Sequence, residues 1–335
     1  MDVSHPVLSH QVQAVNALAL EFDEVLVLTG KIGACHVLPN VTVISTNWVP
    51  KQPVRNSVKF FFRAIPLLAT KKFTSIFSHM TEVQSALIAP LTRILRVKHY
   101  LWYAHKSRSV YLIWCHFWLT GIITSTAGSC PFTGSKVHPI GQAIDTTDFS
   151  LRNLGVDPFT NFIHIGRFDP SKKIENIVLA VAQSRESGKD LRLTLVGSPS
   201  NQIAQSSASE IEKKYENAVL EGWLNFVPAI PRSTVSSYLL KFDVFIHSYA
   251  GSLDKTIVEA TMLGLPVVTV NLEYLAEFGS WSGSANPTLL DEIQGLFSSS
   301  RTEVSRKIQE RWELATKYHS LNHWTSELSR ILRES

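Results

Sequence analysis

The segment Phe162-Ile-His-Ile-Gly-Arg-Phe-Asp-Pro-Ser-Lys-Lys173 joins an apolar, β-type run to a loop that carries cations. Gly166 turns the chain, Arg167 follows it directly, and Lys172 lies five residues further on. Ligands of open α/β sheets bind at the carboxyl ends of strands, where arginine and lysine side chains can hold phosphate groups. The segment therefore predicts a strand end in a parallel α/β sheet with a diphosphate site beside it. The alternative is two solvated cations after a strand.

A second segment, Gly251-Ser-Leu-Asp-Lys-Thr-Ile-Val-Glu259-Ala-Thr-Met-Leu-Gly-Leu-Pro-Val-Val-Thr269, has the pattern of a loop, a helix, a Gly-Pro turn and a buried strand. The helix would begin near Lys255 or Thr256, where free N–H groups can bind phosphate oxygens. The Glu259 carboxylate can accept hydrogen bonds from both hydroxyls of a ribose. An ordinary glutamate on a helix face is the alternative, but the two segments together indicate an enzyme that uses a nucleotide sugar.

Length and composition set the broad class. The chain has 335 residues, which suggests two domains, and 44% hydrophobic against 18% charged residues favours two packed cores. A formal charge of +4 and a pI near 8.9 permit an anionic ligand or an anionic membrane face. The sequence has no basic tail, zinc-finger spacing or aromatic RNA-binding signature, so nucleic acid is not expected as a partner.

The cysteines and acidic residues indicate the cellular compartment and whether the protein binds a metal. Cys35, Cys115 and Cys130 are widely spaced and odd in number, which favours a reduced cytoplasmic compartment without a disulfide framework. The sequence contains no Asp-x-Asp and no His/Asp cluster with metal spacing, so we expect metal-independent chemistry and no cofactor besides the nucleotide-sugar substrate. A hydrolase-type pair of nucleophile and base is absent as well.

Neither the N-terminus nor the most apolar stretch of the chain has the pattern of a membrane-crossing segment. The N-terminus lacks the charged and apolar regions of a signal peptide. Residues 110–124 form the most apolar stretch, but about fifteen residues are too few to span a bilayer, so we expect a buried helix followed by a buried strand.

Residues 55–72 predict a basic amphipathic helix. Arg55, Lys59 and Arg63 recur at every fourth position and share one face. Such a helix can lie peripherally on anionic lipid at the inner face of the membrane, which would suit a lipid-linked acceptor. A core-packing helix with a solvated face is an equal alternative, and Pro66 is expected to kink it. The opposite face is expected to hold Val58, Phe61, Phe62, Ile65 and Ala69, with Lys71-Lys72 closing the segment.

Short β-rich runs alternate with helical segments throughout, which is typical of parallel sheets covered on both faces. A linker is expected at residues 140–149, where periodicity is lost. The predicted strands are residues 24–29, 41–45, 74–78, 99–104, 122–125, 136–139, 162–166, 192–196, 224–227, 244–247 and 266–270. The predicted helices are residues 9–21, 55–72, 82–95, 109–119, 174–187, 206–219, 233–241, 256–263, 287–297 and 303–333, the last interrupted near 319–322.

Taken together, these motifs resemble the GT-B glycosyltransferases, most closely the large retaining family four, the group 1 glycosyl transferases. The resemblance covers most of the chain. In the second half it rests on Gly166-Arg-Phe with Lys172, Thr194-Leu-Val-Gly197-Ser, Asn225-Phe-Val-Pro228, Asp243-Val-Phe-Ile-His-Ser248, Glu259-Ala and Gly264-Leu-Pro-Val-Val268. In the first half it rests on Phe77-Ser-His79-Met and Leu101-Trp-Tyr-Ala-His105-Lys, and near the C-terminus on Trp324.

The resemblance implies an α/β protein with two Rossmann-like, doubly wound parallel-sheet domains facing a cleft. Residues 1–148 would bind the acceptor, residues 149–318 would bind the nucleotide sugar, and residues 319–335 would form a helix that crosses back to the first domain. The implied activity is a hexosyltransferase, which moves a hexose from a UDP- or GDP-sugar to a glycan or lipid-linked acceptor with retention, in polysaccharide or glycolipid biosynthesis.

The resemblance also implies roles for individual residues. Arg167, Lys172 and His105 would be catalytic, and His79 and His105 would contact the acceptor or the transferred sugar; for each histidine the alternative is a structural role at a strand end. The implied donor-binding residues are Gly166, Arg167, Lys172, Gly197, Val227, Pro228, Gly251, Ser252, Leu253, Asp254, Lys255, Thr256 and Glu259.

The sequence departs from the family pattern in three places. The first of two glutamates expected eight positions apart falls on Gly251. The Gly-rich turn expected after the first strand is replaced by Val7-Leu-Ser-His-Gln11, and the sequence begins where that strand should already have ended. Either the strand is missing or the start of the gene is misjudged. A binding-only protein of the same fold, or a nucleotide-sugar epimerase, therefore stays an alternative.

Overall fold

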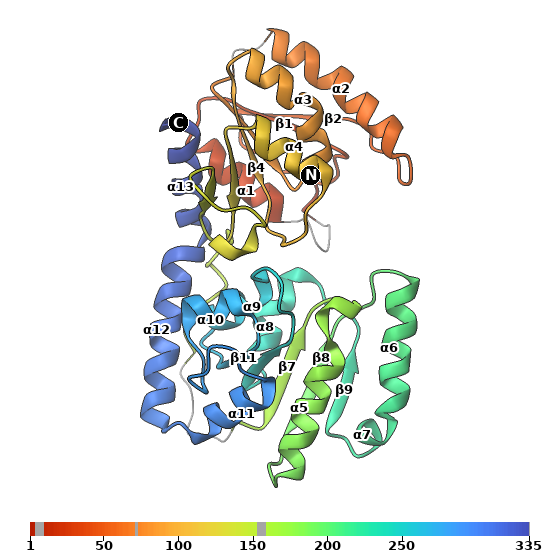
Figure 1. Cartoon of the computed structure of the whole chain (residues 1–335), viewed down its shortest axis with the longest axis vertical. Coiled ribbons are helices and arrows are strands. Elements are labelled where there is room, and N and C mark those ends of the chain that lie inside the picture. The colour runs from red at the N-terminus through yellow and green to blue at the C-terminus, as the bar shows by residue number, and fades with distance from the viewer. Residues whose placement is uncertain (4–9, 71–72, 153–158, 335) are drawn as a thin grey trace. The chain divides into compact units, whose positions relative to one another are not determined.

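The computed structural model describes residues 1–3, 10–70, 73–152 and 159–334 (Figure 1). The chain divides into two compact units, one formed by Met1–Asp145 with Tyr318–Ser335 and the other by Thr146–Lys317. The segment Val7–Gln11, which stands in place of the expected Gly-rich turn, falls partly outside the described residues, and Lys71-Lys72 falls wholly outside them.

The first unit contains parallel strands only, in the part of it that the structure describes. β1 pairs with β2, and a separate sheet has the order β3-β4-β5-β6. Parallel strands buried on both faces read as apolar runs, as at Gly121–Thr124, where every residue is buried. The strands are β1 (Val25–Thr29), β2 (Val41–Ser45), β3 (Ser75–His79), β4 (Lys98–Trp102), β5 (Gly121–Thr124) and β6 (Val137–Pro139).

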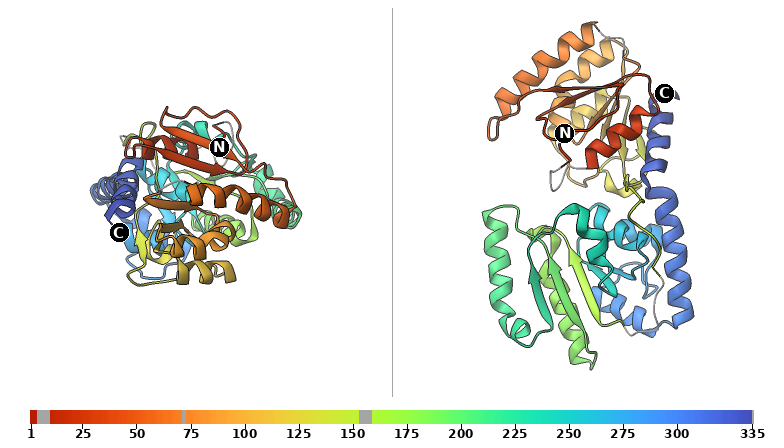
Figure 2. Two further views of the ribbon diagram at one scale, coloured as in Figure 1. Left: turned by 90° about the horizontal axis from the view of Figure 1, so that it is seen from above. Right: turned by 180° about the vertical axis from the view of Figure 1, so that it is seen from behind.

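Helices cover both faces of the β3–β6 sheet (Figures 1 and 2). Because successive side chains of a strand point to opposite faces, Leu101 packs with α3 and α4, whereas Tyr100 and Trp102 pack with the C-terminal helix. Trp324 of that helix is buried against Trp102 and Phe77. The helices of this unit are α1 (His10–Ala19), α2 (Pro53–Thr70), α3 (Glu82–Ile94), α4 (Val110–Trp118) and α13 (Leu321–Glu334), with a short turn η1 (Ala127–Ser129).

The second unit has one parallel sheet of order β11-β10-β7-β8-β9. The chain begins at the central strand, builds one side of the sheet and then crosses back to build the other. The direction of winding therefore reverses between β7 and β10, and a ligand site is expected at the carboxyl ends of these two strands. The strands are β7 (Asn161–Ile165), β8 (Arg192–Val196), β9 (Leu224–Val227), β10 (Val244–His247) and β11 (Val267–Thr269).

Helices α5 and α11 share one hydrophobic core with the sheet, and α9 contacts β10 and β11. α11 begins with a capping box, in which the Thr288 and Asp291 side chains each accept from the backbone N–H of the other. The elements are η2 (Pro170–Lys172), α5 (Ile174–Glu186), α6 (Gln202–Lys214), α7 (Glu216–Leu220), η3 (Arg232–Thr234), α8 (Val235–Leu239), α9 (Lys255–Met262), α10 (Leu272–Phe278), α11 (Leu289–Ser298) and α12 (Arg301–His319).

Every predicted strand overlaps an observed one, but the helices differ in two places. The helix predicted at residues 206–219 is two helices, α6 and α7, separated at Tyr215. α10 was not predicted, because its seven residues are too few to show a helical period. Its start is fixed by Asn271, whose side chain accepts a hydrogen bond from the N–H of Tyr274 at 3.0 Å.

The expectation of a buried helix at the start of residues 110–124 is wrong. In α4 only Leu112 and Cys115 are buried, and Val110, Tyr111, Ile113, Trp114 and Phe117 are between 46% and 79% exposed. Because nearly every residue of this helix is apolar, the sequence does not show that only one of its faces packs inward. The strand that follows, β5, is buried as expected. No helix in the described ranges is both long and apolar enough to cross a membrane.

The apolar face predicted for α2 is also wrong in part. The side of α2 that packs inward carries Ala64 and Leu68. Of the predicted apolar face, Phe61 and Ile65 are half-buried, and the others are exposed: Val58, Phe62 and Ala69. The α-helix continues through Pro66 to Thr70. Exposed apolar side chains at Val58 and Phe62 therefore alternate with the predicted cations Lys59 and Arg63 along the outer side of this helix.

Candidate functional site

Lys172 lies at the carboxyl edge of the second unit's sheet, where the winding reverses. It ends the short turn η2 after β7, and its side chain is buried. The Ser248 hydroxyl, just beyond β10, donates to the backbone oxygens of Lys172 and Lys173, the latter at 2.9 Å. Lys173 adopts a left-handed backbone with φ of 48°, which is uncommon outside glycine. The turn is therefore tied to the neighbouring strand β10.

The Lys172 ammonium pairs with the carboxylate of Asp254 and lies 3.7 Å from the centre of the Tyr249 ring. Asp254 is the residue before α9, a position whose side chain usually caps the helix. Here the carboxylate makes no capping hydrogen bond to α9, because it binds Lys172 and His247 instead. Backbone N–H groups at the start of α9 therefore have no side-chain cap from Asp254.

The charge of Asp254 is stabilised by its partners. Burial alone would raise the pKa of this carboxyl, but the hydrogen bond from His247 and the positive charge of Lys172 together hold the pKa well below its usual range. His247 Nε2 lies 3.0 Å from Asp254 Oδ2. A carboxylate only accepts hydrogen bonds, so Nε2 carries the proton and donates it to this bond.

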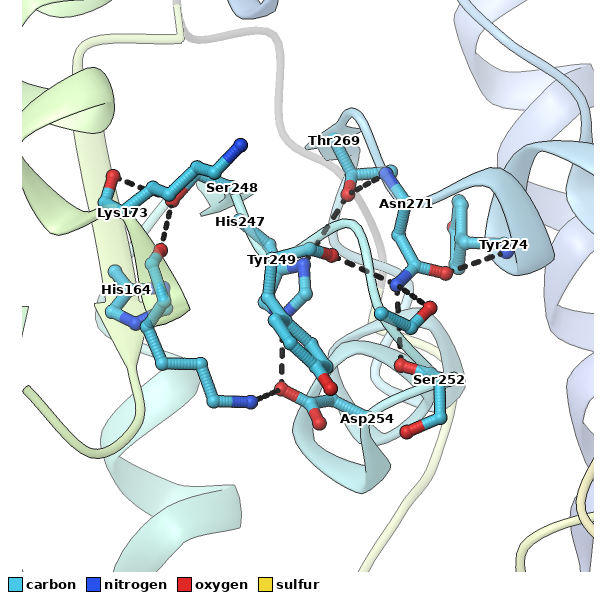
Figure 3. Close-up of polar contacts among 12 residues, drawn as sticks. His164, Lys173, His247, Ser248, Tyr249, Ser252, Asp254, Thr269, Asn271 and Tyr274 are labelled. Atoms are coloured by element: carbon cyan, nitrogen blue, oxygen red, sulfur yellow. Dashed lines mark hydrogen bonds and ion pairs between the residues drawn. The ribbon is translucent and has the colours of Figure 1, made fainter. Parts of the chain in front are cut away.

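A hydrogen-bond network continues from His247 to the loop of residues 249–252 (Figure 3). His247 Nδ1 lies 3.3 Å from the Thr269 hydroxyl, which accepts from the N–H of Asn271 at 3.0 Å. The Asn271 amide group donates to the backbone oxygens of Tyr249, Gly251 and Ser252 at 2.8, 3.3 and 3.2 Å. Asn271 thus fixes the loop that carries Tyr249.

The Tyr249 ring fills the space beside Gly251. A Cβ atom on Gly251 would lie 2.0 Å from both Cζ and the hydroxyl oxygen of Tyr249. A side chain at position 251 is therefore incompatible with the observed position of the tyrosine. The same ring covers the Lys172 ammonium, so the absence of a side chain at Gly251 and the environment of Lys172 are coupled.

Glu259 is fully buried in α9 and pairs with the guanidinium of Arg232. Arg232 belongs to η3, in the segment that follows β9. Burial lowers the pKa of Arg232 to about 10, a value at which the side chain is still charged at neutral pH. A ribose could use the Glu259 carboxylate only if Arg232 shared it or moved away.

Backbone contacts join the carboxyl ends of β7, β8 and β9. The N–H of Gly166 binds the oxygen of Val196 at 3.0 Å, and the N–H of Gly197 binds that of Val227 at 2.9 Å. A Cβ on Gly197 would lie 1.9 Å from the Gly166 oxygen, so only glycine permits this approach. The predicted donor-binding residues Gly166, Gly197, Val227 and Pro228 therefore follow one edge of the sheet.

Arg167 lies at the same edge but differs from Lys172. Its side chain is 66% exposed and its Nε lies 3.4 Å from Asp169 Oδ2. The guanidinium is thus available to an anion that could compete with Asp169. A hollow next to this loop is lined by Asp169, Lys173 and Lys214 among others, and by neither Lys172 nor Glu259.

The two histidines predicted from the first unit lie near the ends of β3 and β4. His79 ends β3 opposite Trp102 in the register, and the two rings are stacked with centroids 6.0 Å apart. His105 is exposed three residues after β4, with its ring edge-to-face with Tyr103. Both therefore lie near the carboxyl ends of neighbouring parallel strands, at one edge of the sheet.

Comparison with known proteins finds a family similarity within the second unit. Residues 153–278, which include Lys172, Asp254 and Glu259, match the family model described as Glycosyl transferases group 1. This region is similar to the group 1 glycosyl transferases. No curated protein sequence matches the chain significantly.

Solved structures show that the whole chain has the GT-B fold of glycosyltransferases. Anabaena HepE with UDP and glucose aligns with a TM-score of 0.74 at 15% identity, covering 100% of this chain and 98% of that one. The sucrose-phosphate synthase of Thermosynechococcus elongatus gives 0.75 at 17%, covering 96% and 91%. A glycosyltransferase from Rickettsia africae gives 0.70 at 15%, covering 100% and 96%.

The sequence predicted Lys172, Asp254 and Glu259 as donor-binding residues but did not predict their partners in the second unit. Those partners are His247, Ser248, Tyr249 and Asn271 near the ends of β10 and β11, and Arg232 in η3. A usable signal was present for His247 and Ser248, which follow directly on a buried apolar run. No group of three His, Cys, Asp or Glu side chains arranged to hold a metal occurs among the described residues.

Replacing Asp254 by asparagine removes the anionic partner of buried Lys172, so we expect it to lower the free energy of unfolding by about 3 kcal/mol at neutral pH. The folded-state pKa of Asp254 is depressed, so the stabilisation is complete above the unfolded value of about 4 and is lost as the pH falls further. The difference between wild type and Asp254→Asn in urea unfolding should therefore shrink in acid. Asp190→Asn, in an exposed pair with Arg185, serves as the control; equal effects of both substitutions would contradict this account.

The contact between Tyr249 and Gly251 predicts a strong coupling between these positions. Gly251→Ala should destabilise the domain by about 1–3 kcal/mol, because the new methyl group displaces the ring. In a Tyr249→Ala background most of this cost should disappear. A double-mutant cycle of thermal unfolding measures the coupling, and additive effects would show that the ring does not restrict position 251.

Proposed function

We propose that the protein transfers a hexose from a nucleotide-diphosphate sugar to a glycan or lipid-linked acceptor, with retention of configuration. The observation that carries the proposal is the position of Lys172 and the start of α9. Both lie at the carboxyl edge where the sheet winding reverses, inside the region that matches the group 1 family. The structural neighbour HepE is described in complexes with UDP and with UDP-glucose, which supports a UDP-sugar as donor.

The diphosphate would be held by Arg167, Lys172 and the backbone N–H groups at the start of α9. As the bond between the anomeric carbon and the phosphate oxygen breaks, negative charge grows on the leaving diphosphate. Cations and N–H dipoles that are already in place stabilise that charge without further reorganisation. We propose that these groups supply the neutralisation and that transfer needs no bound metal or other cofactor.

For the chemical step we propose front-face substitution. The acceptor oxygen bonds to the anomeric carbon on the side that the phosphate leaves, through an oxocarbenium-like state. The departing phosphate oxygen takes the acceptor proton, so no separate base is required. His79 and His105, at the sheet edge of the first unit, are proposed to contact the acceptor or the transferred sugar.

The ribose of the donor would hydrogen-bond to the Glu259 carboxylate. Because Arg232 already pairs with this buried group, we propose that the two share it in the complex, with ribose hydroxyls donating to the carboxylate oxygen that does not pair with Arg232. The base of the nucleotide would then lie towards the segment after β9, near Val227 and Pro228.

We further propose that the protein works at the cytoplasmic face of a membrane, in polysaccharide or glycolipid biosynthesis. The exposed cations and apolar side chains of α2 support peripheral contact with anionic lipid through residues 55–72.

A binding-only protein is the second candidate, and one observation favours it. Lys172 and Glu259 are both paired within the chain, with Asp254 and Arg232 respectively. Such pairs could stabilise a fold that holds a nucleotide without turnover. Tight binding of UDP or GDP together with no nucleotide release from any donor, for a range of glycan and lipid acceptors, would establish this alternative.

Arg167→Ala should lower kcat/KM for sugar transfer by about a hundredfold or more, because it removes a cation aimed at the developing charge. Nucleotide release from a panel of UDP- and GDP-sugars, with and without membrane lipid extract, measures the effect. Arg192→Ala is the matched control, since Arg192 is exposed at the opposite, amino end of β8. Unchanged turnover in Arg167→Ala would remove the diphosphate assignment.

Wild-type protein should bind UDP about tenfold more tightly than 2′-deoxy-UDP, because the missing hydroxyl leaves the Glu259 carboxylate with one hydrogen bond fewer. In Glu259→Gln this discrimination should fall to near unity. Isothermal titration calorimetry gives the four dissociation constants. Equal affinities for the two nucleotides in the wild type would place the ribose elsewhere.

A further inference from the structure

Helix α4 of the first unit exposes a continuous apolar surface. Val110, Ile113, Trp114 and Phe117 recur at intervals of three and four residues, which places them on one face, and Tyr111 adjoins them. All five are at least 46% exposed. Folded monomers rarely expose large contiguous apolar patches unless these bind a partner. We call these five residues the α4 face.

The α4 face is bordered by cations at both ends of the helix. Lys106 and Arg108 precede it and are exposed. At the other end the Lys136 ammonium donates to the backbone oxygens of His116, Phe117 and Leu119 at 3.2, 3.4 and 3.3 Å, so its charge lies beside the last turn. A cation is favourable at that helix end.

The wider region has the same sign of charge. Residues 51–136 contain twelve lysines and arginines and a single acidic residue, Glu82. α3 contacts both α2 and α4, so the exposed cations and apolar side chains of α2 belong to the same helical layer (Figure 1). Glu82 begins α3, and its backbone oxygen accepts from the thiol of Cys115.

We propose that the α4 face is a membrane-docking surface that inserts into the headgroup region of an anionic bilayer. Aromatic side chains such as Trp114, Tyr111 and Phe117 are favoured at the boundary between headgroups and acyl chains, and cations at their edge attract anionic lipid. This proposal goes beyond the α2 contact, because it assigns insertion to a different helix, α4, on which all five residues of the exposed face are apolar or aromatic. It does not depend on the transferase activity.

A second copy of the chain is the competing occupant, and charge argues against it. Pairing two α4 faces would bring together two surfaces that each carry a large excess of positive charge. Like charges across an interface are unfavourable, whereas an anionic bilayer offers the opposite charge over the whole area.

The test is sedimentation of the full chain with vesicles of phosphatidylcholine and phosphatidylglycerol in equal parts, or of phosphatidylcholine alone. Wild-type protein should bind the anionic vesicles, and binding should weaken as salt is raised. The double variant Ile113→Ser, Phe117→Ser should lower the partition coefficient by about tenfold or more, because two large apolar side chains no longer leave water.

The matched control is Ile203→Ser with Leu220→Ser, which removes two similarly exposed apolar side chains from the second unit. It should bind vesicles as the wild type does. Arg55→Gln with Arg63→Gln measures the charge contribution of α2 separately. Because all these side chains are exposed, circular dichroism and thermal unfolding of the variants should match the wild type.

Three results would overturn the proposal: wild-type protein that ignores anionic vesicles, an α4 variant that binds them as well as wild type, or a control variant that loses binding equally. Sedimentation velocity without lipid measures the oligomeric state and so tests whether a second copy binds the α4 face. If the wild type is a dimer that the α4 substitutions dissociate, and it does not bind vesicles, then the partner of the α4 face is a second copy of the chain and not a membrane. The Kd for UDP is measured in parallel, so failure of nucleotide binding is distinguished from failure of docking.

Discussion

The ion pair between Lys172 and Asp254 is the interaction on which the site depends. It joins the turn after β7 to the residue that precedes α9, and so it spans the point where the sheet changes its direction of winding. Burying an unpaired ammonium or carboxylate would cost several kcal/mol. The attraction between the Lys172 and Asp254 charges offsets part of that cost for both groups. The cost of forming the pair is that Asp254 does not cap α9. Asp254 therefore serves the ion pair at the sheet edge and not the start of the helix.

The polar residues around this pair range from buried, hydrogen-bonded side chains to an exposed one. Asn271 and Thr269 are buried and fix the loop of residues 249–252, and the loop in turn holds the Tyr249 ring over Lys172. Arg167 lies at the accessible end with an exposed side chain. Binding sites commonly combine an accessible charged group with such a supported inner layer, since geometry is then preserved while the ligand enters.

The sequence predicted the fold well because parallel strands buried on both faces produce apolar runs that helices and loops interrupt, as at Val244–His247. It also predicted that Lys172 follows a strand and that Glu259 lies on a helix, as the structure shows, whereas their role in donor binding stays a prediction. It could not predict Arg232 as the partner of Glu259, because that contact joins segments with no shared local pattern. Nor could it predict which side of α4 meets the sheet: when nearly every residue of a helix is apolar, hydrophobicity alone does not define a buried face.

The packing of α13 on the first unit has a consequence for how the protein is made. Trp324 fills the space against Trp102 and Phe77, with ring centroids 5.9 Å from each, and Leu328 and Ile331 extend this core. These side chains are translated only after the entire second unit. The nascent first unit therefore lacks this part of its apolar core until residues 321–334 have been synthesised.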